Sequence, residues 1–435
     1  MSVTPLEAVP HLTTALNGPL QQLESVLLER RSHIERWLRE QWRLTPAPFY
    51  ASVDLRNAGF KLAPVDTNLF PAGFNNLAPE FEPLCVQAIQ SAMERFCPDA
   101  CSVLIVPENH TRNGFYLQSV ATLEALFRRA GYDVRVGSLI DELDGPTRVA
   151  TADGDEVVLE PLVRSGNRVG VADFDPCLVV LNNDLSGGRP AILEGLEQPV
   201  MPPLELGWSN RRKSDHFDQY RQVAEEFCEF VGIDPWLITP LHRDCGEVDF
   251  RNRGNGDDCL THNVEQLLDE IRERYRAHGV DREPFVVIKA DAGTYGMGVM
   301  TAHSGEEVRQ LNRKQRNRMS AVKEGLAVSR LLIQEGVHTS ETWGPGDSSA
   351  EPVVYMIDHF VVGGFYRVHH GKGHDENLNA PGMTFESLAF AKSCNCPDER
   401  RAPDASVNRF YAYGVIARLA LLAAARELAA VEDPA

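Results

Sequence analysis

The stretch FYASVDLRNAGFKLAPVDTNLFPAGFNNL, residues 49–77, sets acidic and amide side chains among residues that belong in a core. It divides into two runs with strand character, FYASVDL and FKLAPVDTN. The intervening Asn57-Ala58-Gly59 is a turn signal, because glycine and asparagine accept backbone conformations that other residues avoid. The stretch therefore predicts a pair of strands.

The polar side chains of this pair recur with the period of a strand. Asp66 and Asn68 are two residues apart and fall on one face, while Asp54 lies on the neighbouring strand. Carboxylate and amide oxygens are the ligands that Mg2+ favours. The pattern indicates a metal site. In the alternative, the pair is a structural hairpin whose acids pair with Arg56 and Lys61.

The size and charge of the chain exclude several classes of protein. Its 435 residues are too many for one compact core, so we expect two or three domains. A net charge of −19, from 62 acids and 43 bases, argues against a nucleic-acid partner. Without an apolar run of membrane length or a secretory leader, we expect a cytoplasmic protein with no membrane partner. In that compartment its nine cysteines are expected to be reduced thiols. The sequence does not indicate an oligomeric state.

Residues 101–200 have the pattern of a parallel α/β layer. The runs CSVLIVP, YLQSVATLEALFRRAG and YDVRVGSL form a strand–helix–strand unit, and PCLVVLNND adds another buried strand. In such sheets, ligands bind beyond the carboxyl ends of the strands. Those ends carry the polar residues 108–113 and 182–188, which are either a ligand site or ordinary loops.

The rest of the chain alternates helices and strands without an internal repeat. We expect helices at 11–43, 80–96, 214–231, 261–278 and 407–430, and strands at 284–290, 330–335 and 352–362.

The segment FVVIKADAGTYGMGVM, residues 285–300, is a buried strand followed by a glycine-spaced loop. Lys289 lies near the end of the strand, and Gly293, Gly296 and Gly298 let backbone N–H groups approach an anion closely. A second strand follows in place of a helix, so the loop is neither a Walker loop nor a Rossmann fingerprint. It is either a hairpin that closes over phosphates or a glycine-rich hairpin without a ligand.

The order of segments over residues 205–430 resembles the ATP-grasp ligases, and closely the C-terminal part of bacterial glutathione synthetase. The segments SNRRKSDHF, FVVIKADAGTYGMGVM and LLIQEGV carry the resemblance, together with the strand pair and loop at 353–382. It implies binding of ATP and activation of a carboxylate as an acyl phosphate. The implied roles are phosphate binding by Lys213, Lys289 and the loop glycines, adenine and ribose binding by Gln334, Glu335 and Val337, acyl-phosphate stabilisation by Arg367, and substrate binding by Asn377 and Asn379.

ATP-grasp enzymes carry their magnesium ligands on strands after the last helix, whereas this chain ends at its last helical stretch. Asp54, Asp66 and Asn68 match those ligands at the other end of the chain. We therefore expect an α/β, ATP-grasp-like fold, circularly permuted, with a Rossmann-like parallel-sheet domain. Its parts are N-terminal helices (1–45), the metal-binding strand pair (46–80), the parallel α/β domain (81–200) and the ATP-grasp nucleotide-binding region (201–435).

Nearly the whole chain is similar to a proteobacterial form of glutamate–cysteine ligase described for iron- and sulfur-oxidising bacteria. The segments SVDLRNAGFKLAPVDTNLFPAGFNNL, PENHTRNGFY, GWSNRRKSDHF and IKADAGTYGMGVM carry this similarity. It implies ATP- and Mg2+-dependent joining of the γ-carboxyl group of glutamate to the amine of cysteine. The products would be γ-glutamylcysteine, ADP and phosphate, in the first step of glutathione synthesis.

Arg56 and Arg112, each followed by an asparagine, are candidates for holding a substrate carboxylate. An arginine can bind a carboxylate through two N–H groups, although each of these could instead form a structural ion pair. Two other functions stay open. One is a different ATP-grasp ligase, such as a glutathione synthetase, with another acceptor. The second is a regulatory module that binds a nucleotide without turning it over.

Overall fold

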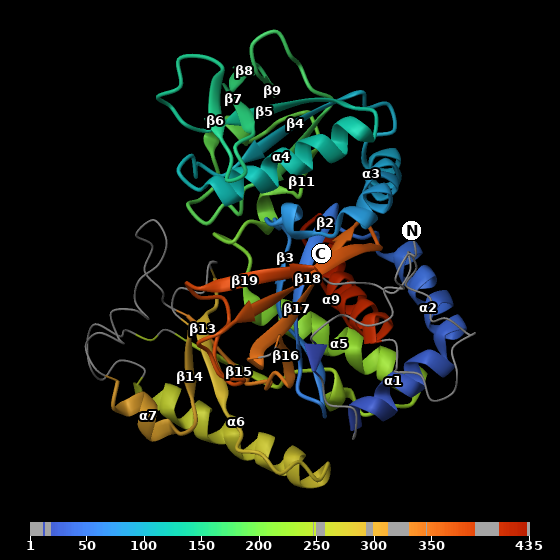
Figure 1. Cartoon of the computed structure of the whole chain (residues 1–435), viewed down its shortest axis with the longest axis vertical. Helices are drawn as coiled ribbons and strands as arrows, with labels where there is room; N and C mark the ends of the chain where they lie inside the picture. The colour runs from blue at the N-terminus through green and yellow to red at the C-terminus, as the bar shows by residue number, and fades with distance from the viewer. Residues whose placement is uncertain are drawn as a thin grey trace.

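The computed structural model describes residues 12–13, 19–246, 248, 257–292, 299–311, 330–344, 346–387 and 409–432. Three sheets carry the architecture, with a mostly parallel sheet and its helices at one end of the molecule (Figure 1). The other two sheets are antiparallel and lie together at the opposite end. The fold is thus mixed α/β, as the sequence predicts.

The first sheet joins the two ends of the chain. Its central strand β17 pairs with β18 along one side, and with β2 and β16 at the two ends of its other side. In this antiparallel pairing Val353 lies opposite Asp54, and β3 continues the sheet beyond β2. Its seven strands are β1 Leu12–Thr13, β2 Tyr50–Asn57, β3 Leu62–Asn68, β16 Glu341–Trp343, β17 Ser348–Ile357, β18 Phe360–His369 and β19 Met383–Ser387.

The predicted strand pair and its turn are both present. Asn57 Oδ1 accepts a hydrogen bond from Gly59 N at 2.9 Å, and Gly59 has a φ of 78°, which favours glycine. The strand pair expected within 353–382 is present as β17 and β18, which meet at a turn of Asp358 and His359, so a single strand over 352–362 is wrong. Two long apolar runs around a two-residue turn look continuous in sequence.

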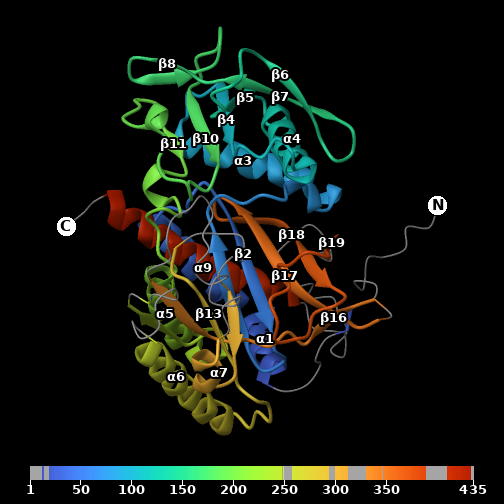
Figure 2. The same ribbon diagram turned by 90° about the vertical axis from the view of Figure 1, so that its left-hand side faces the viewer.

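Helices from both ends of the chain cover this first sheet. Helix α9 Arg409–Glu432 lies between the sheet and α5 Lys213–Val231 (Figure 2). Its residues 411–425 are nearly all buried because α9 is enclosed by the sheet, by α5 and by α1 Pro19–Glu29. Arg418 pairs with Glu35 on α2 Arg31–Leu44 at 2.7 Å.

The second sheet has six strands in the order β11-β10-β4-β5-β7-β6, and all neighbours except β6 and β7 are parallel. The predicted strand–helix–strand unit is β4, α4 and β5. Helix α3 packs against α4 and also against β17 and β18, so it joins the two layers. The bounds are α3 Glu82–Phe96, β4 Ser102–Pro107, α4 Gly114–Arg129, β5 Asp133–Ser138, β6 Thr147–Ala150, β7 Glu156–Pro161, β10 Leu178–Asn182 and β11 Val200–Met201.

The third sheet is antiparallel, in the order β12-β15-β13-β14, with α6 and α7 packed beside it. Strand β14 is the second strand predicted after the glycine-spaced loop, whereas the short strands β6 and β12 carry no strong periodicity and were not predicted. The bounds are β12 His242–Cys245, α6 Asp257–Ala277, β13 Val286–Ala290, β14 Met300–Ala302, α7 Gly305–Arg309 and β15 Leu331–Glu335, and a separate ribbon is formed by β8 Val163–Ser165 and β9 Arg168–Gly170.

One fully buried ion pair links the first and third sheets. Lys61, in the turn between β2 and β3, donates to Glu335 at the end of β15 at 2.6 Å. Neither side chain has measurable solvent exposure. Glu335 also accepts from Trp236 Nε1 at 3.2 Å and from Leu241 N at 2.9 Å. Its carboxylate is therefore held by protein groups.

Replacing Lys61 by alanine should lower the free energy of unfolding by about 3–5 kcal/mol, because it leaves the buried Glu335 carboxylate without its cation. Urea unfolding at pH 7 measures the change. Arg148→Ala is the matched control, since Arg148 and Glu156 form an exposed pair at 3.0 Å and should change stability by less than about 1 kcal/mol. Equal effects of the two substitutions would contradict the structural role of Lys61.

Candidate functional site

A cleft lies where the first and third sheets meet, and most of the residues predicted to bind ATP line it. The lining comes from β2, β3, β13, β15, β17 and β18, from the start of α5 and from the segment after β18. The predicted residues among them are Asp54, Arg56, Asp66, Lys213, Lys289, Gln334, Glu335, Val337, Arg367, Asn377 and Asn379.

Two lysines from distant segments meet at one side of this cleft. Lys213 is the first residue of α5, and its N–H donates to Asp291 O at 2.8 Å. Asp291 follows β13 directly and accepts from Ser214 N and Ser214 Oγ at 2.8 and 2.9 Å. The start of α5 is thereby fastened to the strand that carries Lys289.

The lysine side chains are held at the edge of β3. Lys213 Nζ lies 2.9 Å from Asp66 Oδ1, and Lys289 Nζ donates to Val65 O at 2.7 Å. Burial lowers the pKa of Lys289 to about 8, although the nearby Asp66 opposes this shift. Burial would raise the pKa of Asp66, but Lys213 and Lys289 outweigh it and hold this pKa well below its usual range. Asp66 is therefore ionised at neutral pH.

An alternating row of arginines and acids forms the opposite side of the cleft. Arg367 on β18 donates from Nη1 to Asp54 at 2.8 Å and to Glu351 at 2.6 Å. Glu351 in turn accepts from Arg56 Nε at 2.9 Å. Burial raises the pKa of Asp54 even though Arg367 opposes the shift. Burial would likewise raise the pKa of Glu351, but Arg56 and Arg367 bring it below its usual value.

Two buried donors in the cleft lack a partner among the residues that the structure describes. They are Gln334 Nε2 and Arg367 Nε. Buried polar atoms almost always have a hydrogen-bond partner, and exceptions often mark places where a ligand completes the set. Both atoms belong to residues that were predicted to contact ATP or the acyl phosphate.

The cleft has oxygen donors for a divalent cation, but fewer than predicted. Asp54 lies directly opposite Asp66 in the β2–β3 register. Asn68 does not line the cleft, because its Oδ1 accepts from Phe70 N at 2.9 Å. In the described part of the chain no group of three His, Cys, Asp or Glu has a metal-binding arrangement. Two carboxylates still fit Mg2+, which takes one or two from the protein and completes its shell with water and phosphate.

Some predicted residues lie elsewhere. Arg112 is exposed in the loop before α4 and lines neither this cleft nor the cavity described below. The glycines Gly293, Gly296 and Gly298 lie outside the described residues. Glu335 lines the cleft, but its carboxylate is engaged by Lys61 and its backbone N–H donates to Leu241 O at 2.7 Å.

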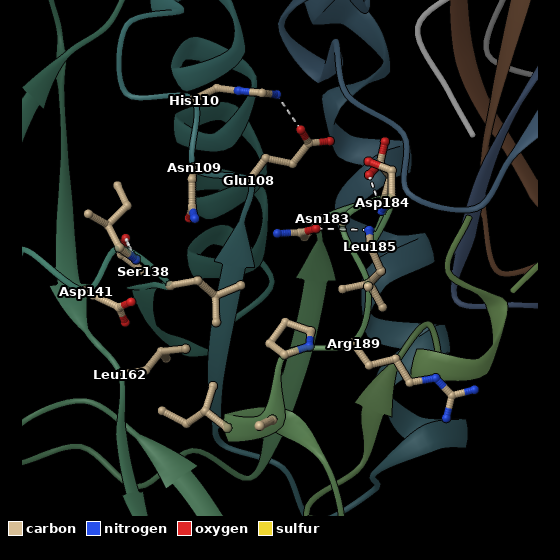
Figure 3. Close-up of a pocket in the computed structure, with 18 of the residues that line it drawn as sticks. Glu108, Asn109, His110, Ser138, Asp141, Leu162, Asn183, Asp184, Leu185 and Arg189 are labelled. Carbon is tan, nitrogen blue, oxygen red and sulfur yellow. Dashed lines mark hydrogen bonds and ion pairs between the residues drawn. The ribbon is translucent and has the colours of Figure 1, made fainter. Parts of the chain in front are cut away.

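A larger cavity of about 620 Å³ lies at the carboxyl ends of β4, β5 and β10 (Figure 3). Glu108 pairs with His110 on one side, and Asp184 accepts from Ser186 N at 2.9 Å on the other. Arg189 belongs to the lining but pairs with Glu205 outside it, at 2.9 Å. The charged side chains of the lining are mostly acidic, namely Glu108, Asp141 and Asp184.

Trp208 lies beside a lining residue of the acidic cavity and a lining residue of the cleft. Its backbone N–H donates to Asp184 O at 2.9 Å, while Lys213 Nζ lies 3.8 Å from the centre of its ring. The Trp208 side chain is buried, and its Nε1 has no partner within the described ranges. One residue thus contacts a wall residue of each site.

Sequence reasoning missed Glu351, Asp291 and Trp208. Glu351 lies directly opposite Arg367 in the β17–β18 register. The only sequence signal for it was the presence of an acid next to the apolar run of the strand. Asp291 directly follows Lys289 and Ala290 in a segment already singled out, but its capping of α5 depends on tertiary contact. Trp208 had no signal of its own.

Buried cations and carboxylates around a cleft between two sheets are typical of enzymes that bind the phosphates of a nucleotide. The family model for glutamate-cysteine ligase, GshA, matches residues 24–428, and the chain belongs to this family. It is an ATP-dependent ligase that joins glutamate to cysteine in the first step of glutathione synthesis. Its substrates are small molecules.

A solved structure from Methylobacillus flagellatus KT, provisionally named a gamma-glutamylcysteine synthetase, is 59% identical over 97% of this chain and 99% of its own, with a TM-score of 0.89. A glutathione synthetase-like effector from Globodera pallida is 11% identical over 87% and 86% of the two chains, with a TM-score of 0.36. D-alanyl-alanine synthetase A from Vibrio cholerae is 10% identical over 74% and 81%, with a TM-score of 0.33. No curated protein matches the chain.

The regulatory module without turnover is set aside, because the family is one of enzymes. Within the described residues, no helix combines the length and the apolar character that a membrane crossing requires.

Proposed function

We propose that the cleft binds ATP with Mg2+ in an ATP-grasp-like manner, and that the β2–β3 pair supplies the metal-binding carboxylates from the front of the chain. The supporting observation is the meeting of Asp54 and Asp66 with Lys213, Lys289 and Arg367 in one cleft. These residues come from segments far apart in sequence, and the pairing of β2 with β17 brings them together. This arrangement is what a circular permutation of an ATP-grasp domain would give.

Each side of the cleft has its own proposed role. Lys213 and Lys289 hold the phosphates, and Asp66, which neutralises Lys213 in the free protein, is free to bind Mg2+ once phosphate takes its place. Gln334 Nε2 and the backbone of 335–337 bind the adenine end. ATP supplies the phosphoryl group that converts the γ-carboxylate of glutamate to an acyl phosphate.

Arg367 is proposed to stabilise the negative charge that develops during this transfer. Asp54 and Glu351 hold its guanidinium in place, and their charges keep its pKa above the ordinary arginine value although burial opposes the shift. Its Nε–H remains available for a substrate oxygen. Arg56 reaches the same Glu351 and also donates to Val337 O at 3.2 Å, which ties the arginine row to the adenine end.

Replacing Arg367 by methionine should lower kcat on the order of 100- to 1000-fold, because a preorganised donor to developing charge is lost. The KM for ATP should change little, because the phosphates are proposed to be held by Lys213 and Lys289. ADP release with Mg2+, ATP, glutamate and cysteine measures both constants. Arg135→Met, on β5 and paired with Glu160 at 3.0 Å, is the control. Unchanged kcat in Arg367→Met would refute the assigned role.

The acidic cavity is proposed to receive the ammonium group of one amino-acid substrate. Glu108 and Asp184 supply negative charge, and Leu139 and Leu162 supply apolar surface for a short side chain. The contacts of Trp208 with both Asp184 and Lys213 support this proposal, because they link the cavity to one of the lysines proposed to hold the phosphates.

Glu108→Gln should therefore raise the KM for either glutamate or cysteine at least tenfold, and leave the KM for ATP within twofold. The loss corresponds to about 1.4 kcal/mol or more of binding free energy. Steady-state kinetics with each substrate varied in turn identifies the amino acid affected. Glu156→Gln, an exposed acid on β7 of the same sheet, should change none of the three constants. If Glu108→Gln also leaves both amino-acid KM values unchanged, the ammonium assignment is wrong.

A further inference from the structure

Two cysteines meet at the end of the parallel sheet that lies opposite the acidic cavity. Cys101 directly precedes β4, and Cys177 directly precedes its neighbour β10. Their Sγ atoms are 3.8 Å apart, and the backbones are already joined there, because Cys177 N donates to Ser102 O at 3.0 Å. Cys101 is exposed and Cys177 half-buried, so a small reagent can reach the pair.

The serine between them bears on the reactivity of Cys177. Ser102 Oγ lies 3.3 Å from Cys177 Sγ, and it accepts from Cys177 N at 3.1 Å, so its own proton can point to the sulfur. This hydrogen bond, followed by contacts with Cys101, lowers the pKa of Cys177 to about 7. A large fraction of Cys177 is therefore thiolate, the nucleophilic form, at neutral pH.

A second pair of cysteines gives an internal comparison. Cys245 Sγ and Cys259 Sγ are 4.0 Å apart, which is nearly the same spacing. Cys245 is buried, and burial raises the pKa of its thiol to about 12. The two pairs thus have similar sulfur–sulfur distances, and they differ in the burial and the pKa of one thiol.

We propose that Cys101 and Cys177 form a redox-active thiol pair that reacts with low-molecular-weight disulfides of the cystine type. The Cys177 thiolate attacks one sulfur of the disulfide RSSR, forms a mixed disulfide and releases RS−. The Cys101 thiolate then attacks Cys177 Sγ and expels the second RS−. The protein dithiol is oxidised by two electrons and one RSSR is reduced to two thiols.

The backbone needs little movement for this bond. The chain is already joined at this point by the hydrogen bond from Cys177 N to Ser102 O, and the sulfurs must close from 3.8 Å to about 2.05 Å. The bond would join the amino ends of β4 and β10, away from both the cleft and the acidic cavity. The inference is independent of the ATP and amino-acid assignments.

The test uses the full-length protein, reduced, freed of reductant and treated with an equimolar amount of cystine at pH 7. Samples are alkylated at intervals and their disulfides are mapped by peptide mass spectrometry. We expect a loss of 2 Da per chain and a Cys101–Cys177 bond that forms at least tenfold faster than Cys245–Cys259. Cys177→Ser should abolish the fast reaction, and Cys228→Ser, at a buried thiol, should not.

A pH series separates the role of Ser102 from a structural effect. Ser102→Ala should slow the fast reaction several-fold at pH 7 and much less at pH 9.5, where Cys177 is ionised in both proteins. The other titratable groups around the pair are Cys97 and Asp99 after α3, Asp133 on β5, and the Arg168–Asp175 ion pair.

Three results would overturn the proposal. The first is equal rates for the two cysteine pairs. The second is a mixed disulfide on Cys177 that persists without attack by Cys101. The third is a fast bond that contains Cys97 in place of Cys101 or Cys177.

Discussion

The pairing of β2 with β17 is the contact on which the rest of the structure depends. It brings Asp54 opposite Val353 and so inserts a hairpin from the front of the chain into a sheet built from its last third. Without it, Arg367 and Glu351 would face no Asp54, and Lys213 would face no Asp66. The Lys61–Glu335 pair then fixes the same hairpin to the third sheet, which carries Lys289.

The β2–β17 pairing gathers several charges, most of them buried, and most lie beside an opposite charge. Asp66 neutralises Lys213, while Asp54 and Glu351 neutralise Arg367. Buried charges are costly alone, so the free protein keeps its site intact by pairing them internally. In the proposed complex, ligand phosphates would replace the carboxylate beside Lys213, and Mg2+ would then bind the released carboxylate. Under the proposed function, the residues that pair with one another in the unliganded site would also be those that bind Mg-ATP.

Local pattern was enough to predict some elements and residues. The turn at Asn57–Gly59, the unit of β4, α4 and β5, and the position of Arg367 on the second arm of a hairpin all follow from periodicity and glycine placement. The segments with Lys213 and Lys289 were singled out by sequence, but their meeting depends on Asp291, whose capping contact is tertiary. Asn68 shows that the alternation of a strand does not by itself place a side chain, because Asn68 Oδ1 accepts a hydrogen bond from Phe70 N. Glu351 and Trp208 could not be predicted, because their contacts with Arg367 and Lys213 form only in the folded protein.

The central claim is that the β2–β3 hairpin provides the metal-binding end of the nucleotide site. Its most direct test uses electron paramagnetic resonance to measure the binding of Mn2+ to the full-length protein in the presence of a non-hydrolysable ATP analogue. Asp66→Asn should weaken this binding at least tenfold, and Asp155→Asn, an exposed acid between β6 and β7, should leave it unchanged. Equal Mn2+ affinity in wild type and Asp66→Asn would contradict the account.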